Sequence, residues 1–81
     1  MKEIILIYGK RCLESRHSLE FVEELKNEFE DIEIKTIEFS FSNEFIKELG
    51  IVITPTFVFN NKILCIGTPE KNFLLEKINE L

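Results

Sequence analysis

Residues 8–15 read Tyr-Gly-Lys-Arg-Cys-Leu-Glu-Ser and join two segments with different hydrophobic patterns. The first strand is expected over residues 3–8, which are rich in isoleucine and continuously apolar from residue 4 onward. This pattern is typical of a strand buried on both faces beside parallel neighbours. After residues 8–15, apolar side chains recur at helical spacing, with glutamate and lysine between them, so we expect an amphipathic helix that starts within residues 11–15. The apolar positions of that helix are Phe21, Val22, Leu25 and Phe29.

Two elements are predicted in the middle of the chain. Residues 32–38 hold three isoleucines and one threonine, which favours a second strand, and the charges within this strand place it near an edge of the sheet. A short helix begins at Ser42, and Gly50 ends it because glycine takes the left-handed conformation at little cost. Its apolar residues are Phe45, Ile46 and Leu49.

A hairpin is predicted next. Residues 56–60 and 62–66 are strand-like, and Asn60-Asn61 between them tolerates the positive φ of a tight turn. The two strands are therefore antiparallel. With the turn centred there, the numbers of two paired residues sum to 121, so Cys65 is expected to lie opposite Thr56.

The chain is predicted to close with a third helix. Thr68 is a suitable N-cap with Pro69 at the first helical position, and the apolar face consists of Phe73, Leu74, Ile78 and Leu81. The element order is βαβαββα. A right-handed crossover makes the first two strands parallel, so we expect one α/β domain over residues 1–81, with a four-stranded mixed sheet and helices on both faces.

Composition excludes several classes of function. The chain has 81 residues, and 10 basic against 15 acidic residues give a net charge of −5, without the electrostatic footprint of a nucleic-acid-binding protein. The longest apolar run, residues 4–8, is too short for a membrane-spanning helix or a signal-peptide core. We expect a cytoplasmic monomer with neither nucleic acid nor membrane as a partner.

The element order resembles that of the thioredoxin/glutaredoxin superfamily, nearest the small prokaryotic glutaredoxin-like thioredoxins. The resemblance rests on residues 8–12 (Tyr-Gly-Lys-Arg-Cys) before the first helix and residues 50–56 (Gly-Ile-Val-Ile-Thr-Pro-Thr) before the hairpin. It implies a thioredoxin fold. The redox motif of that superfamily is Cys-x-x-Cys, whereas this chain reads Cys12-Leu13-Glu14-Ser15. Because Ser15 stands where the resolving cysteine would be, chemistry at this site is expected to be monothiol.

Cys12 is the candidate nucleophile. A cysteine in the first turn of a helix faces unpaired N–H groups and the positive end of the dipole, which favour the thiolate. Ser15 is placed to donate an O–H hydrogen bond to its sulfur. Four basic or titratable residues stand near the cysteine in the sequence, and the only acid among them is Glu14; the four are Lys10, Arg11, Arg16 and His17. This local positive charge is expected to lower the thiol pKa or to attract an anionic thiol such as glutathione. The alternative is an ordinary helix start with solvated charges, and His17 is expected to be exposed.

Substrate binding is assigned to Arg11 because of its positive charge beside Cys12, and to Thr54 and Pro55 by the resemblance. It implies a cis bond before Pro55 that holds the proline ring against the sulfur, with the Thr54 backbone offered to an extended peptide or to glutathione. The alternative is that Pro55 only begins a strand. The start of the third helix, at Gly67-Thr68-Pro69-Glu70, matches only part of the glutaredoxin pattern that binds the γ-glutamyl carboxylate.

Cys65 is the remaining candidate for a resolving thiol. In the fold that the resemblance implies, its strand is separated from the first strand by the third. Two strand spacings are near 10 Å, whereas a disulfide needs Cα atoms within about 7 Å. We therefore expect no direct bond between Cys12 and Cys65, and we expect Cys65 to pack as a small apolar residue.

Three functions remain open from the sequence. The first is monothiol exchange at Cys12 and Ser15, acting on protein disulfides or glutathione-mixed disulfides, with glutathione as co-substrate and neither a metal nor a tightly bound cofactor. The second is a redox-inactive binding module that uses the groove beside Pro55. The third, iron–sulfur cluster handling, is disfavoured because Leu13 and Glu14 replace the central pair of the Cys-Gly-Phe-Ser loop of that class.

Overall fold

The predicted order of elements is confirmed by a computed structural model, which describes residues 2–79. The elements are β1 (Lys2–Tyr8), α1 (Leu13–Glu28), β2 (Ile32–Glu38), α2 (Glu44–Leu49), β3 (Thr56–Phe59), β4 (Lys62–Ile66) and α3 (Lys71–Asn79). Leu81, predicted on the apolar face of the last helix, lies outside the described residues. No helix among residues 2–79 is long and apolar enough to cross a membrane.

The sheet has four strands in the order β2-β1-β3-β4. β1 pairs in parallel with β2 and antiparallel with β3, and β3 pairs antiparallel with β4. The sheet is therefore mixed, as predicted. β2 lies at an edge, where the charges along it remain accessible to water, and β1 lies in the centre, which agrees with its continuous apolar character.

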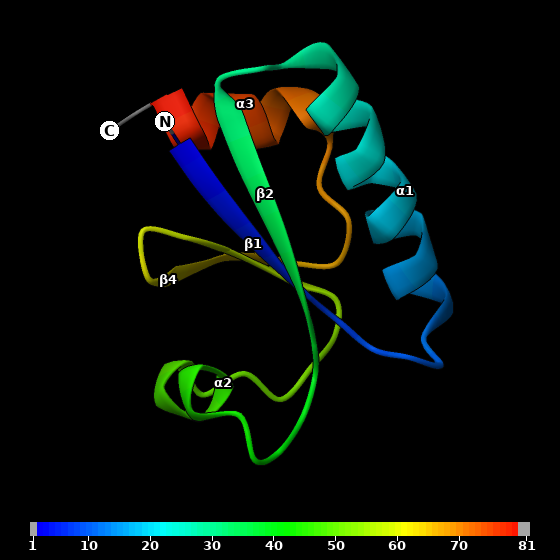
Figure 1. Ribbon diagram of the computed structural model, residues 1–81, viewed down its shortest axis with the longest axis vertical. Helices are drawn as coiled ribbons and strands as arrows, with labels where there is room; N and C mark the ends of the chain where they lie inside the picture. The colour runs from blue at the N-terminus through cyan, green and yellow to red at the C-terminus, as the bar shows by residue number, and fades with distance from the viewer. Residues whose placement is uncertain (1, 80–81) are drawn as a thin grey trace.

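Helices cover both faces of the sheet (Figure 1). The side chains of β1 alternate between the two faces and so belong to two separate core clusters. Ile4 and Leu6 are fully buried and belong to the cluster that includes Val22 of α1 and Leu74 of α3. Ile7 belongs to the second cluster, with Ile46 of α2. Because both faces are packed, the carboxyl end of β1 is held firmly, and the loop that follows it carries Cys12.

The start of α2 differs from the prediction by a short distance. Asn43, rather than Ser42, caps the helix, and its side-chain oxygen accepts a 3.0 Å hydrogen bond from the Ile46 N–H. The Ser42 hydroxyl is instead 2.9 Å from that of Ser40. Gly50 ends the helix with φ of 71°, as predicted.

The predicted N-cap of the third helix is wrong. α3 begins at Lys71, and the Leu74 N–H bonds to the Glu70 carbonyl at 3.1 Å. The physical reason is that the Thr68 hydroxyl bonds to side chains of α1, so it is not available to the first turn of α3.

The hairpin turn is confirmed, and its register is only partly as predicted. Asn60 and Asn61 have φ of 54° and 61°. Near the turn, Val58 pairs with Ile63, but the register then shifts between Phe57 and Val58. Because β4 carries one extra residue at this bulge, Cys65 lies opposite Phe57 and not opposite Thr56.

Candidate active site around Cys12

Cys12 is the N-cap of α1. Its backbone is extended, with φ of −105° and ψ of 119°, and its sulfur accepts a hydrogen bond from the Ser15 N–H at 3.4 Å. The cysteine side chain therefore occupies the position in which serine, threonine or aspartate usually satisfies an unpaired amide of the first turn. This places the sulfur at the positive end of the helix, where the thiolate is favoured.

Ser15 is fully buried and contacts both the loop and the cysteine. Its hydroxyl oxygen accepts a 2.9 Å hydrogen bond from the Gly9 N–H. The pKa of the Cys12 thiol is lowered, first by the hydrogen bond from the Ser15 side chain and then by the Ser15 backbone N–H, while desolvation opposes the shift. The position of Ser15 agrees with the predicted O–H hydrogen bond, and its catalytic role stays a prediction.

The Thr54-Pro55 segment lies directly beside the sulfur. The bond between these residues is cis, and Pro55 is buried. The Cys12 thiol is placed to donate to the Thr54 carbonyl at 3.7 Å, and a hydrogen bond with the Thr54 side chain also lowers the pKa of Cys12. The structure thus brings Cys12, Ser15, Thr54 and Pro55 together, as the sequence analysis expects.

Gly9 is a site residue that the sequence analysis treats only as the end of a strand. A Cβ atom at this position would lie 2.5 Å from the Thr54 side-chain oxygen and 3.2 Å from the Cys12 Cβ. Only a residue without a side chain allows this close approach. The signal in the sequence is a glycine placed immediately after a strand and three residues before the cysteine.

A hydrogen-bonded chain ties the loop before α3 to α1, and sequence reasoning also missed it. The Thr68 hydroxyl donates to the Glu14 carboxylate at 2.6 Å, so the buried Ser18 hydroxyl, 2.6 Å away, donates to Thr68. The neighbouring Gly67 N–H donates to the Pro55 carbonyl at 2.8 Å. The chain therefore connects the first turns of α1 to the segment that faces Cys12.

The basic residues around Cys12 line a hollow. A cavity of about 380 Å³ lies against the loop after β1 and the first turns of α1, and its lining includes Lys10, Arg11 and Arg16. Arg11 is exposed beside Cys12 at the rim of this cavity, and its role in substrate binding stays a prediction. His17 is exposed, as expected.

Cys65 is not placed as a partner for Cys12. Both thiols are free, and β3 lies between the strand that carries Cys65 and β1. Cys65 is partly buried, which raises the pKa of its thiol. Among residues 2–79 there is also no group of three or more histidine, cysteine or acidic side chains that could hold a metal ion.

Comparisons with known proteins identify the fold. No protein-family model and no curated protein matches the chain. Among solved structures, mitochondrial thioredoxin 3 from Saccharomyces cerevisiae is 21% identical with a TM-score of 0.77, and the match covers 99% of this chain and 78% of that one. Thioredoxin f from spinach chloroplast is 24% identical with a TM-score of 0.76, covering 98% and 74%.

A third structure, solved as a complex of ferredoxin:thioredoxin reductase with thioredoxin f2, is 25% identical with a TM-score of 0.75, covering 98% of this chain and 76% of that one. These likenesses, together with the strand order, show that the chain has the thioredoxin fold.

Proposed function

We propose that this protein carries out thiol–disulfide exchange with a single cysteine, Cys12, as the nucleophile. The observation that carries the proposal is the contact of Ser15 with Cys12. Serine stabilises the thiolate, since it lowers the pKa of Cys12, yet it supplies no second sulfur. The site is therefore suited to attack a disulfide and unsuited to release the product by an internal disulfide.

The proposed reaction has two steps. The Cys12 thiolate attacks the glutathione sulfur of a glutathione-mixed disulfide, the S–S bond breaks, and the protein thiol leaves as a thiolate that takes a proton from water. A second glutathione thiolate then attacks the glutathione sulfur on Cys12. This step regenerates the Cys12 thiolate and releases oxidised glutathione, so that one disulfide is reduced and one is formed.

The surface beside Cys12 supports a peptide substrate. Within residues 2–79 the Thr54 N–H donates no hydrogen bond, so it is free to pair with an extended chain. Leu13, Val52 and Ile53 flank this position and are 75%, 76% and 52% exposed. A contiguous patch of exposed apolar side chains marks a contact surface for proteins, and we propose that these three side chains form one.

The proposed partners are therefore protein disulfides or glutathione-mixed disulfides, and the proposed location is the reducing cytoplasm. The thioredoxin f2 neighbour is bound to a reductase, which is a precedent for a protein partner on this fold.

The experiment uses the Cys65→Ser variant, so that every modification reports on Cys12. Alkylation by iodoacetamide is followed against pH, and glutathione exchange is followed by mass spectrometry. We expect a Cys12 pKa below the free value of about 8.5, a single glutathione adduct, and loss of that adduct when glutathione is added. A pKa near the free value together with an adduct that does not turn over would contradict the proposal.

The exposed apolar side chains also favour a second candidate, a binding module without redox activity. The two candidates differ in their need for the sulfur. A Cys12→Ser variant keeps full binding to a captured partner if the protein is a binding module, whereas it loses the covalent adduct if the protein is an exchange enzyme.

A further inference from the structure

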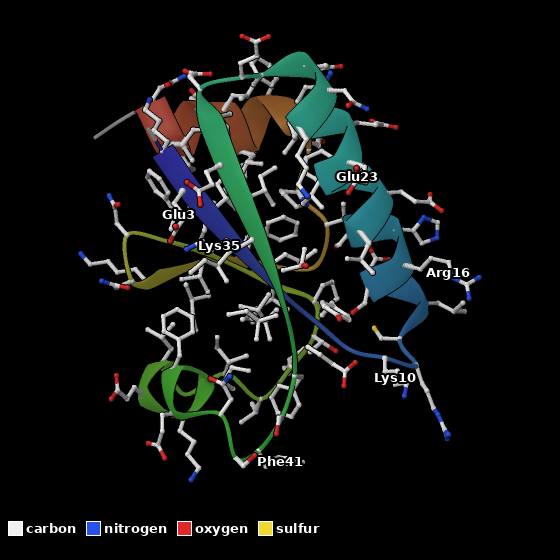
Figure 2. All side chains as sticks on the ribbon, viewed as in Figure 1. Glu3, Lys10, Arg16, Glu23, Lys35 and Phe41 are labelled. Carbon is white, nitrogen blue, oxygen red and sulfur yellow. The ribbon has the colours of Figure 1, made fainter. Side chains whose placement is uncertain are left out.

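The cavity beside Cys12 combines apolar walls with a cationic rim. Tyr8 at the end of β1 and Leu19 of α1 are half-buried and line it, together with Lys10, Arg11 and Arg16. Figure 2 shows Lys10 on the loop after β1 and Arg16 on the first part of α1, at the same corner of the molecule. The volume of about 380 Å³ suits a small molecule.

Charge pairing sets these cations apart from most of the other lysines. Lys62 of β4 also forms no ion pair within residues 2–79, but it stands alone, whereas the three cations of the cavity lie together. Four other lysines each lie within 4.0 Å of a glutamate oxygen, namely Lys26, Lys35, Lys47 and Lys71. In the part of the chain that the structure describes, neither Lys10 nor the two arginines form an ion pair. In a chain of net charge −5 this leaves unneutralised positive charge concentrated at one cavity.

Glu14, the nearest acid in the sequence, forms no ion pair with the cations of the cavity within residues 2–79. Glu14 lies between Arg11 and Arg16 in the sequence, but its carboxylate accepts the hydrogen bond from Thr68 of the loop before α3. The acidic side chain is thus held by a loop that does not line the cavity. Cys12 lines the same cavity as these cations.

We propose, on the basis of the function proposed above, that this cavity binds the anionic group of the small thiol that exchanges with Cys12. A carboxylate or sulfonate would pair with Arg16 and Arg11, since guanidinium groups bind such oxyanions through two parallel hydrogen bonds. The carbon chain of the thiol would lie against Tyr8 and Leu19. Cys12 therefore reacts selectively with negatively charged small disulfides over neutral or cationic ones.

The test compares three small disulfides that differ in charge. They are bis(2-sulfonatoethyl) disulfide, bis(2-hydroxyethyl) disulfide and cystamine, and each reacts in the same way: the Cys12 thiolate attacks one sulfur, the S–S bond breaks, and one thiolate leaves. Rates are measured by mass spectrometry in the Cys65→Ser background, with and without Arg16→Gln. The neutral disulfide serves as the internal reference, because a changed Cys12 pKa affects all three rates equally.

We expect Arg16→Gln to lower the rate with the sulfonate disulfide about two- to fivefold relative to the neutral one, the size of an exposed ion pair. The rate with cystamine should not fall. Raising the ionic strength from about 0.01 to 1 M, which shortens the Debye length from about 30 to 3 Å, should remove the preference. Lys62→Gln, at the far end of the hairpin, is the matched control and should leave it unchanged.

The two proposals fail in different ways. If all three disulfides react and Arg16→Gln does not change their ratio, the anion site is wrong and the exchange function stands. If none reacts, the exchange function is wrong, and the cavity is tested without a thiol. In that case amide shifts of Tyr8 and Leu19 are followed by NMR during titration with 2-(methylthio)ethanesulfonate and its neutral analogue 2-(methylthio)ethanol. Shifts of equal size with both compounds would overturn the anion site.

Discussion

The Ser15 hydroxyl oxygen lies 2.9 Å from the backbone nitrogen of Gly9 and accepts its hydrogen bond. This contact joins the loop after β1 to α1 and leaves the hydroxyl proton available for the Cys12 sulfur, whose pKa the Ser15 side chain lowers. One serine therefore fixes the loop that carries the cysteine and also favours its reactive form.

Replacing Ser15 by alanine should raise the Cys12 pKa. Ser15→Ala removes the largest cause of the lowered value but keeps the backbone N–H bond at 3.4 Å, so part of the shift should remain. It also leaves the Gly9 N–H without its acceptor, which costs about 1 kcal/mol of unfolding free energy. Iodoacetamide alkylation against pH measures the shift. Cys65, whose pKa is raised by burial, is the internal control and should keep its profile. An unmoved Cys12 profile would mean that Ser15 does not act on the sulfur.

The lowered pKa of Cys12 also predicts how stability depends on pH. Between the folded and unfolded pKa values of this thiol, the unfolded chain binds more protons than the folded chain, so the unfolding free energy rises with pH and is lost as pH falls through the folded pKa. Urea denaturation of Cys65→Ser across this window should show the rise. Adding Cys12→Ser should abolish it, and a rise that persists would have to come from another group.

A second thiol at position 15 should change the mechanism. The Cα atoms of residues three apart on a helix lie about 5 Å from each other, within the range that a disulfide spans. The Ser15 nitrogen is already 3.4 Å from the Cys12 sulfur. In Ser15→Cys, the new thiol should displace glutathione from Cys12 without a second glutathione. Mass spectrometry of the Cys65→Ser background would show loss of the adduct and gain of an internal disulfide, whereas an adduct that persists would show that the thiols do not meet.

Local patterns in the sequence were sufficient to predict most of the fold. Three elements follow from patterns among neighbouring residues, and the structure confirms each of them. They are strand β1 with its continuous apolar run, helix α1 with its amphipathic pattern, and the hairpin turn with its two asparagines. The joint position of Cys12 and Thr54-Pro55 came from the resemblance to a known superfamily. Whether a cation forms an ion pair depends on which acids the fold brings near it. No pattern in the sequence therefore indicates that the three cations of the cavity form none within residues 2–79.

The features that were missed depend on contacts between distant parts of the chain. Thr68 is a good N-cap by local rules, but Ser18, fifty residues away in sequence, uses its hydroxyl. The bulge that moves Cys65 opposite Phe57 depends on how β4 packs on β3. The need for glycine at position 9 appears only when Thr54 lies against it.

Gly9→Ala should impair the site more than its effect on stability indicates. The added Cβ meets the Thr54 side-chain oxygen at 2.5 Å, so Thr54 must move away from Cys12. We expect a loss of about 1 to 3 kcal/mol in unfolding free energy and slower exchange. Gly50→Ala is the matched control, because nothing lies within 4 Å of its Cβ and its φ of 71° costs alanine about 1 to 2 kcal/mol. Equal exchange rates in the two variants would show that the Gly9 contact does not position the site.

Thr68 should affect both the stability of the fold and the pKa of Cys12 through its hydrogen bonds to α1. Thr68→Val keeps the shape of the side chain but leaves the buried Ser18 hydroxyl without its acceptor, which costs about 1 to 3 kcal/mol. It also frees Glu14, whose carboxylate then weakens the positive charge around Cys12 and raises the thiol pKa. Thr68→Ser keeps the hydroxyl and should restore both properties. Denaturation in urea measures the first, and alkylation against pH measures the second. If Thr68→Val loses stability while its alkylation profile stays that of the parent protein, the loop supports the fold alone, and Glu14 does not affect the charge at Cys12.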